Sequence, residues 1–417
     1  MRWMPYLIAG GVSLPWLYFA ATGTHPADLV TAALTGVAIL GAAFLLSWAC
    51  EVAEMDVPQA LAVSVLALIA VLPEYAVDAT FAWKAGEWAA ANPGHSGLEP
   101  GHINENAGYA IANMTGGNRL LLGLGWSLLA IIGYLRTRET RIELPRDMGA
   151  DVTILLCATM YAVVPVMRGS LNLFDTAVYG TLYVLYLVAA ARGEEHEGEL
   201  VGPAKQLEGL TPTWRRVSVV FLFVFAASVI FISAEPFAEA LVHTGKSLGI
   251  DEFVLVQWLA PLASESPEVV VAVLLVWRGH RSKGLRTLVS SNVNQWTLLV
   301  GTLSVVYSIA AGGPAALPLD DRQQAEVLLT AAMCLFAAAT IADLKFVLWQ
   351  AAALTGLFMV AVFLPHLHFA VGATFLVLAL GIFVVEPGTR AGLIQCVRTF
   401  VALLRGRTTE RSGEGAV

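Results

Sequence analysis

Long apolar runs alternate with short polar segments along the whole chain. We place about twelve runs, each near the roughly 20 residues that a helix needs to cross a bilayer. Turn-forming residues separate them, as in Asn92-Pro93-Gly94 and Gly312-Gly313-Pro314. Because lipid offers no partner to an unpaired backbone group, this pattern predicts an all-α, polytopic membrane protein. The predicted spans cover residues 5–22, 27–50, 58–83, 107–135, 148–167, 171–191, 217–243, 252–277, 287–310, 325–342, 346–365 and 368–386.

Composition excludes a water-soluble fold. Of the 417 residues, 57% are hydrophobic and 13% are charged, whereas soluble domains average roughly 45–50% and 25%. The mean hydropathy of +0.70 calls for an apolar solvent around the protein. Nucleic-acid binding is also excluded, because the net charge is −8 and the basic residues form no stripe on a soluble face.

The basic residues predict how the chain is oriented, since Lys and Arg gather on the cytoplasmic side. With the N-terminus inside, 19 of the 24 basic residues fall in the N-terminus, the inner loops and the C-terminal tail. Four fall in outer loops, and Arg119 lies within a span. We therefore expect an integral protein of the plasma (inner) membrane with both termini in the cytoplasm. The tail from residue 387 is either an interfacial helix or a disordered basic stub.

Two pairs of segments repeat along the chain. LALIAVLPEYAVD at 66–78 and APLASESPEVVVA at 260–272 both place Pro-Glu inside an apolar helix, and the two Pro-Glu pairs lie 194 residues apart. ANMTGGNRLLLGLG and TLVSSNVNQWTLLVG follow them, with Asn118 and Asn292 174 residues apart. A longer loop near 84–106 in the first half accounts for the difference. The sequence therefore predicts two related halves.

Each half holds five spans, and an odd number makes the second half enter the membrane from the opposite side. The site of such inverted repeats lies at their interface near the bilayer midplane. The predicted division is an extra span in 1–26, a first repeat in 27–191, a cytoplasmic linker in 192–216, a second repeat in 217–365, and an extra span with the tail in 366–417.

Four acidic residues lie at this interface: Glu74, Asp78, Glu265 and Glu268. An ionised side chain at the membrane centre costs about 2.5–3.5 kcal/mol on insertion scales, so four unpaired acids need a compensating charge. The spacing of three or four residues puts each pair on one helix face. Acidic oxygens around one point are the ligands that Ca²⁺ prefers, and the neighbouring prolines leave backbone carbonyls available.

Small and amide side chains on the second segment of each half complete the predicted site. Small residues let the helices approach closely, and amide oxygens are further ligands. The small residues are Gly116, Gly117, Ser290 and Ser291, and the amides are Asn113, Asn118, Asn292 and Gln295. For Asn118 and Asn292, hydrogen bonding between helices is an equal alternative to ligation. For Asp78 and Glu265, support of the ligands or pairing between helices is an equal alternative to direct ligation.

These duplicated segments resemble the alpha repeats of the cation/calcium exchanger superfamily, which includes sodium/calcium exchangers. The resemblance is carried by VLPE and ANMTGGN in the first half and by ESPE and TLVSSN in the second. It implies alternating access at one acidic site that Ca²⁺ and a counter-ion occupy in turn. It also implies that Glu74 and Glu268 are the central Ca²⁺ ligands, surrounded by Asn113, Gly117, Ser264, Ser291 and Gln295.

The chain departs from the family pattern at several positions. Val71 and Glu265 replace hydroxyl residues before the Pro-Glu pairs, and Leu121 stands where an amide is common. Fewer hydroxyls and additional acids favour H⁺ over Na⁺ as the coupling ion. We expect Arg119 to pair with one of the additional acids, Asp78 or Glu265.

The leading interpretation is a secondary antiporter that exports Ca²⁺ in exchange for H⁺ or Na⁺. Na⁺/H⁺ exchange without Ca²⁺ transport is the alternative. We expect no resident cofactor, since the ions are substrates, and the partners are the lipid bilayer and the transported cations. The chain has no HExxH, Gly-x-Ser-x-Gly or ATP-binding Gly-x-x-x-x-Gly-Lys pattern, so we expect a transporter and not an enzyme or an ATP-driven pump.

Overall fold

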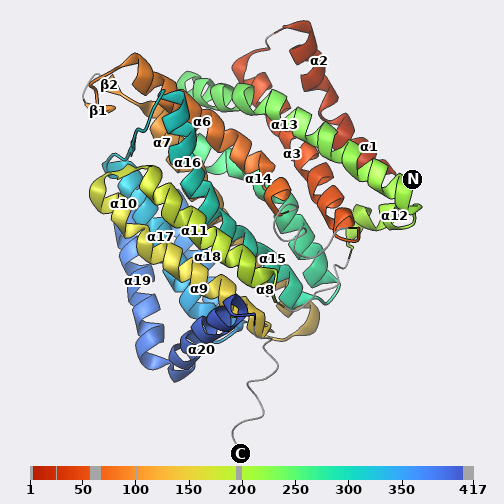
Figure 1. Ribbon diagram of the computed structural model, residues 1–417, viewed down its shortest axis with the longest axis vertical. Helices are drawn as coiled ribbons and strands as arrows, with labels where there is room; N and C mark the ends of the chain where they lie inside the picture. The colour runs from red at the N-terminus through yellow and green to blue at the C-terminus, as the bar shows by residue number, and fades with distance from the viewer. Residues whose placement is uncertain (1–2, 25, 57–66, 100–101, 194–199, 407–417) are drawn as a thin grey trace, which may run out of the picture.

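The computed structural model describes residues 3–24, 26–56, 67–99, 102–193 and 200–406, and they are predominantly helical (Figure 1). The N-terminal part and first repeat contain α1 (Met4–Gly11), α2 (Leu14–Thr22), α3 (Asp28–Ala53), α5 (Ala67–Ala70), α6 (Leu72–Ala91), α7 (Glu105–Leu120), the π-helical turn η2 (Leu121–Trp126), α8 (Ser127–Thr137), α9 (Gly149–Tyr161), α10 (Val163–Arg168) and α11 (Leu173–Ala190).

The second half repeats this order after a short connection. It contains α12 (Lys205–Glu208), α13 (Pro212–Leu248), α14 (Glu252–Trp277), α15 (Arg281–Asn294), the π-helical turn η5 (Gln295–Leu299), α16 (Val300–Ala310), α17 (Asp321–Ile341), α18 (Leu348–Phe363), α19 (His368–Val385) and α20 (Pro387–Leu404). Short 3₁₀ turns lie at Arg146–Met148, Gly202–Ala204 and Pro365–Leu367.

The predicted membrane-helical fold is confirmed. Within the described ranges, ten helical segments are long and apolar enough to cross a bilayer, and Leu348–Phe363 is a shorter apolar helix. The predicted span at 58–83 lies partly outside the described residues. Its described part is broken between α5 and α6, and α6 continues to Ala91, past the predicted end.

The described residues also form three two-stranded ladders that were not predicted. β1 (Leu98–Glu99) and β2 (His102–Ile103) form a small hairpin in a loop. β3 (Arg141–Glu143) pairs with β6 (Lys345–Val347), and β4 (Ser170–Leu171) pairs with β5 (Leu317–Pro318), all antiparallel. Each of the last two ladders joins a loop of one half to a loop of the other, so both link the repeats outside their helices.

The first long helices of the two halves, α3 and α13, pack side by side (Figure 1). Arg215 of α13 also donates to both carboxylate oxygens of Asp56, just beyond α3, at 2.7 Å. These hydrogen bonds, with the positive charges of Arg215 and Arg216, hold the pKa of Asp56 below its usual value. The two halves are therefore connected by an ion pair at the end of α3 as well as by apolar packing.

Each Pro-Glu helix packs against the other half: α6 contacts α16, and α14 contacts α7. Figure 1 shows α6 and α14 between the α3–α13 pair and the group formed by α9, α11, α17 and α19. Pro73 lies in the first turn of α6, which puts Glu74 directly after the break from α5. Pro261 and Pro267 lie inside α14. The two Pro-Glu turns thus meet at the interface of the repeats.

The first part of the C-terminal tail is the helix α20. Thr389, Cys396, Phe400 and Leu403 are buried on one of its faces, and α20 packs on α9. The guanidinium of Arg192 donates to the carbonyl oxygens of the last two residues of this helix. The structure therefore supports the helical alternative for this part of the tail; residues 407–417 lie outside the described residues.

Candidate ion-binding site

Three carboxylates converge where α6 and α14 meet. One oxygen atom from each of Glu74, Glu265 and Glu268 lies within 4.8 Å of the other two. Glu74 and Glu265 are 3% and 1% exposed, and Glu268 is half-buried. Because Ca²⁺ binds oxygen at 2.3–2.6 Å, two oxygens on opposite sides of one ion are up to roughly 5 Å apart. The three carboxylates therefore suit a single Ca²⁺ without a helix movement.

Most oxygens of this cluster have no hydrogen-bond donor among the described residues. Both oxygens of Glu74, Oε2 of Glu265 and Oε2 of Glu268 are buried without a partner. An uncompensated carboxylate in an apolar interior carries a large desolvation cost, which a bound cation removes. The cluster is thus arranged to accept positive charge.

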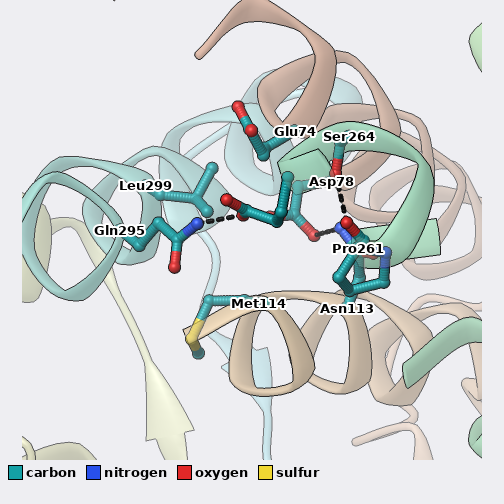
Figure 2. Close-up of a pocket in the computed structure, with 10 residues that line it drawn as sticks. Glu74, Asp78, Asn113, Met114, Pro261, Ser264, Gln295 and Leu299 are labelled. Atoms are coloured by element: carbon teal, nitrogen blue, oxygen red, sulfur yellow. Dashed lines mark hydrogen bonds between the residues drawn. The ribbon is translucent and has the colours of Figure 1, made fainter. Parts of the chain in front are cut away.

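Asp78 lies one helical turn after Glu74 and is oriented from α7. Nδ2 of Asn113 donates to Oδ1 of Asp78 at 2.8 Å. Figure 2 shows this hydrogen bond as a dashed line. The second carboxylate oxygen, Oδ2, and the amide oxygen of Asn113 both lack a donor in the described part of the chain. Asp78 and Asn113 therefore add two oxygen atoms to the same pocket.

Gln295, on the turn η5, orients Glu265 of α14 within the second half. Its amide nitrogen donates to Oε1 of Glu265, and its own Oε1 has no donor among the described residues. Figure 2 shows the hydrogen bond that leaves the amide nitrogen of Gln295 as a dashed line. Gln295 begins the π-helical turn η5, and Leu121 begins the matching turn η2. These two residues have the same separation in sequence as Asn118 and Asn292. A π-helical turn redirects side chains locally and is frequent at functional sites. The apolar Leu121 gives the first half no equivalent amide.

The pocket brings together most of the predicted site. Its lining residues are Glu74, Asp78, Asn113, Met114, Gly117, Pro261, Ser264, Glu265, Gln295 and Leu299. Glu268 adjoins it through the carboxylate cluster. Met114, Pro261 and Leu299 were not predicted, although Pro261 and Leu299 each lie one helical turn from a predicted residue on the same helix.

Glycine residues let α7 approach α14 at this point. A Cβ atom at Gly117 would lie 3.1 Å from Oε1 of Glu265, and one at Gly116 would lie 1.9 Å from the carbonyl oxygen of Gln257. Pro261 has no N–H to donate to that carbonyl, which in a regular helix would be its partner. The predicted role of Gly116 and Gly117 in close approach agrees with this geometry.

The structure places Asn118 and Asn292 away from the pocket. Nδ2 of each donates to the backbone carbonyl of the other, at 3.4 and 3.1 Å. Their amide oxygens accept from Cys334 Sγ and Trp126 Nε1. Successive helix residues point about 100° apart, so Asn118 turns away from the face that carries Gly117. This geometry favours the alternative in which the two amides join the repeats.

Ser291, a further predicted ligand, also lies outside the pocket lining. Its hydroxyl oxygen is buried without a hydrogen-bond partner among the described residues. Its ligand role therefore stays a prediction without a contact to support it.

Replacing Asn292 by Ala tests the joining role. We expect the free energy of unfolding to fall by about 1–3 kcal/mol, because the buried Trp126 indole N–H loses its acceptor. Ca²⁺ affinity should change little. Thermal unfolding in detergent and Ca²⁺ binding measure the two effects, with Asn92→Ala as a control outside the interface. A large loss of Ca²⁺ affinity with unchanged stability would identify Asn292 as a ligand.

The expected pairing of Arg119 with Asp78 or Glu265 is wrong. Arg119 is fully buried and forms its ion pair with Glu326 of α17. Glu326 was missed in the sequence, although an acidic residue inside the predicted span 325–342 was the available signal. The lining residues of the pocket include no basic side chain.

Comparisons with known proteins agree with this arrangement. The family model described as sodium/calcium exchanger protein matches residues 28–192 and 218–370. The chain belongs to the sodium/calcium exchanger family. The resemblance seen in the sequence is thereby confirmed, and membership of this exchanger family makes the chain a transporter. A comparison with curated protein sequences found no match.

Solved structures of exchangers share the fold. The crystal structure of the H⁺/Ca²⁺ exchanger CAX has 42% sequence identity to this chain and a TM-score of 0.89, with 97% of this chain and 98% of that chain covered. The structure of native YfkE has 14% identity and a TM-score of 0.62, covering 91% of this chain and 100% of that one. A structure of the sodium-calcium exchanger NCX_Mj has 16% identity and a TM-score of 0.51, covering 81% and 99%. The last two show the fold alone.

Proposed function

We propose that this exchanger-family protein is a secondary antiporter that moves Ca²⁺ against H⁺ through the pocket around Glu74, Glu265 and Glu268. The observation that carries the proposal is the approach of three carboxylate oxygens to within 4.8 Å of one another, without a basic residue in the pocket lining. Ca²⁺ prefers such clusters of acidic oxygens. Amide oxygens of Asn113 and Gln295 complete the proposed ligand set.

Protons are the proposed counter-ion. Four carboxyl groups lie in or beside the pocket, whereas Ser264 is the one hydroxyl side chain among its lining residues. When Ca²⁺ leaves, neighbouring carboxylates in an apolar medium are stabilised by taking up protons. The similarity to the H⁺/Ca²⁺ exchanger CAX, at 42% sequence identity, supports the same choice.

Alternating access is the proposed mechanism. One Pro-Glu helix packs on α16 and the other on α7, so the pocket is bounded by two seams that the inverted repeat relates. Opening one seam at a time would expose the carboxylates to one side of the membrane only. Competition between Ca²⁺ and H⁺ for these carboxylates would couple the two fluxes. The proposed direction is Ca²⁺ export across the plasma membrane, with both termini in the cytoplasm.

Purified protein in sealed vesicles tests this function. The vesicles are loaded with Ca²⁺, and Ca²⁺ efflux is followed under an imposed pH, Na⁺ or K⁺ gradient. We expect a pH gradient to drive Ca²⁺ efflux and the other gradients to have no effect, because the pocket offers titratable groups in place of Na⁺-binding hydroxyls. Protein-free vesicles are the control. Ca²⁺ efflux under a Na⁺ gradient alone would assign Na⁺ as counter-ion, and pH-driven Na⁺ flux without Ca²⁺ flux would support Na⁺/H⁺ exchange.

A further inference from the structure

A second buried polar cluster lies outside the ion pocket, around Glu326 of α17. The carboxylate is 2% exposed and accepts from the fully buried Arg119 of α7. Nε2 of Gln257 on α14 donates to the same oxygen, Oε2, at 2.9 Å. Nδ1 of His368 lies 3.0 Å from the other oxygen, Oε1. One carboxylate on α17 therefore contacts side chains from α7, α14 and α19.

Arg119 fixes this carboxylate to α7. Its Nε donates to the carbonyl oxygen of Thr115 at 3.2 Å, and its guanidinium lies over the ring of Trp258, 5.3 Å from the centroid. Separating a buried ion pair leaves each charge without a partner, which is strongly unfavourable. We therefore expect the pair of Arg119 and Glu326 to persist while other contacts of the cluster change.

Gln257 contacts that ion pair through its own side chain, a neutral amide. It lies two helical turns before Glu265, and its carbonyl oxygen occupies the place that a Cβ at Gly116 would need. Its side chain and its backbone thus both close the seam between α7 and α14, on the side of the pocket where α14 begins. Residues of α7 and α14 both line the pocket, so this seam forms part of the wall between the pocket and that side.

The first half carries a carboxylate at a matching place. Asp151 of α9 is 3% exposed and accepts from Tyr186 and from Ser290 of α15, each at 3.1 Å. The separation of Asp151 and Glu326 in sequence differs by one residue from the separation of Asn118 and Asn292. In each half, therefore, a buried acid contacts the Asn-bearing helix of the other half. The counterpart of Gln257 would be residue 63, which lies outside the described residues.

We propose that Glu326 is a positioning residue of the exchange cycle and that the hydrogen bond it accepts from Gln257 is a latch. The latch holds the first two turns of α14 against α7 while the pocket is closed on that side, and it is released when the pocket opens there. Gln257 touches no transported ion and acts through the position of α14. The inference rests on the proposed exchange function.

The test measures the two sides of the membrane separately. Purified protein is reconstituted in vesicles of known orientation, and exchange of radiolabelled for unlabelled Ca²⁺ is followed at equal pH on both sides. The half-saturating Ca²⁺ concentration is determined on the side where α14 begins and on the opposite side. Gln257→Leu removes the donor with a side chain of similar size.

We expect the ratio of the two apparent affinities to shift roughly tenfold in favour of the side where α14 begins, since a hydrogen bond to a charged group is worth about that factor. A change in the populations of the two open states acts on the two sides in opposite directions. A merely structural defect would lower both affinities alike and leave their ratio unchanged. The ratio therefore separates a latch from general destabilisation.

Gln324→Leu is the matched control, because Gln324 lies on α17 but donates to the carbonyl of Leu319. Its affinity ratio should equal that of the unmodified protein. Gln257→Asn, whose amide is one methylene shorter, should shift the ratio in the same direction as Gln257→Leu and serves if that variant does not fold. An unchanged ratio in the Gln257 variants, with Ca²⁺ exchange intact, would overturn the latch. Absence of Ca²⁺ exchange in the unmodified protein would instead overturn the proposed function.

Discussion

Replacing Glu74 or Glu268 by Gln is expected to lower Ca²⁺ affinity at least about 100-fold and to abolish Ca²⁺ transport, because each change removes one negative charge from a buried, close-packed ion site. The same substitution should not lower the stability of the ion-free protein. It removes a buried carboxylate oxygen that has no donor among the described residues, so nothing favourable is lost. Vesicle transport and thermal unfolding in Ca²⁺-free detergent measure the two effects.

Glu87→Gln is the matched control for Glu74, because Glu87 lies on the same helix and is exposed. This variant should transport Ca²⁺ normally. A structural ion pair would give the opposite signature, with lower stability and retained transport in the Glu74 and Glu268 variants. Full transport in both would refute the assignment of the site.

Gly116→Ala is expected to have the largest effect on stability. A Cβ atom at this position would lie 1.9 Å from the backbone carbonyl oxygen of Gln257, and a backbone atom cannot rotate away as a side chain does. Since α7 and α14 must separate, we expect the free energy of unfolding to fall by about 3 kcal/mol. Ca²⁺ transport should fall with it, because the same helices line the pocket. Thermal unfolding with and without Ca²⁺ measures the effect.

Gly180→Ala on α11 provides the comparison. A Cβ atom there would meet no atom within 4 Å. Replacing an open helical glycine by alanine should raise stability by about 0.4–1 kcal/mol, because the unfolded chain loses conformational freedom. Equal stability changes in the Gly116 and Gly180 variants would show that helix propensity, and not the close approach of α14, decides the result.

The duplicated Pro-Glu segments pointed to the acidic residues that the structure brings together in the candidate site. An acidic residue is costly in a membrane helix, so its presence in both halves indicated function before any contact was known. The odd number of spans in each half then predicted the inverted topology, and the described helices form the predicted all-α membrane fold. Glu74 and Glu265 lie together because α6 and α14 each begin their Pro-Glu turn at the interface of the repeats.

The directions of side chains and the ion pairs between distant residues were harder to predict from the sequence. Asn118 and Gly117 are adjacent in sequence, yet one helical step of about 100° separates the face that lines the pocket from the face that joins the repeats. The π-helical turns change the directions of the side chains further, and no pattern of residues predicted these turns. Arg119 pairs with Glu326, which lies 207 residues further along the chain. Hydrophobic periodicity alone does not predict such a pair.

Arg119 pairs with Glu326, so it does not add a fixed positive charge to the described lining of the pocket. None of the described lining residues is basic, so in the proposed exchange the transported ions would be the positive charges that balance the carboxylates of the pocket. If two protons replace each Ca²⁺, the loaded and exchanged forms carry equal charge and the potential does no net work. With three protons, one charge moves per cycle, and each 100 mV contributes about 2.3 kcal/mol. The voltage dependence of Ca²⁺ transport therefore counts the protons exchanged.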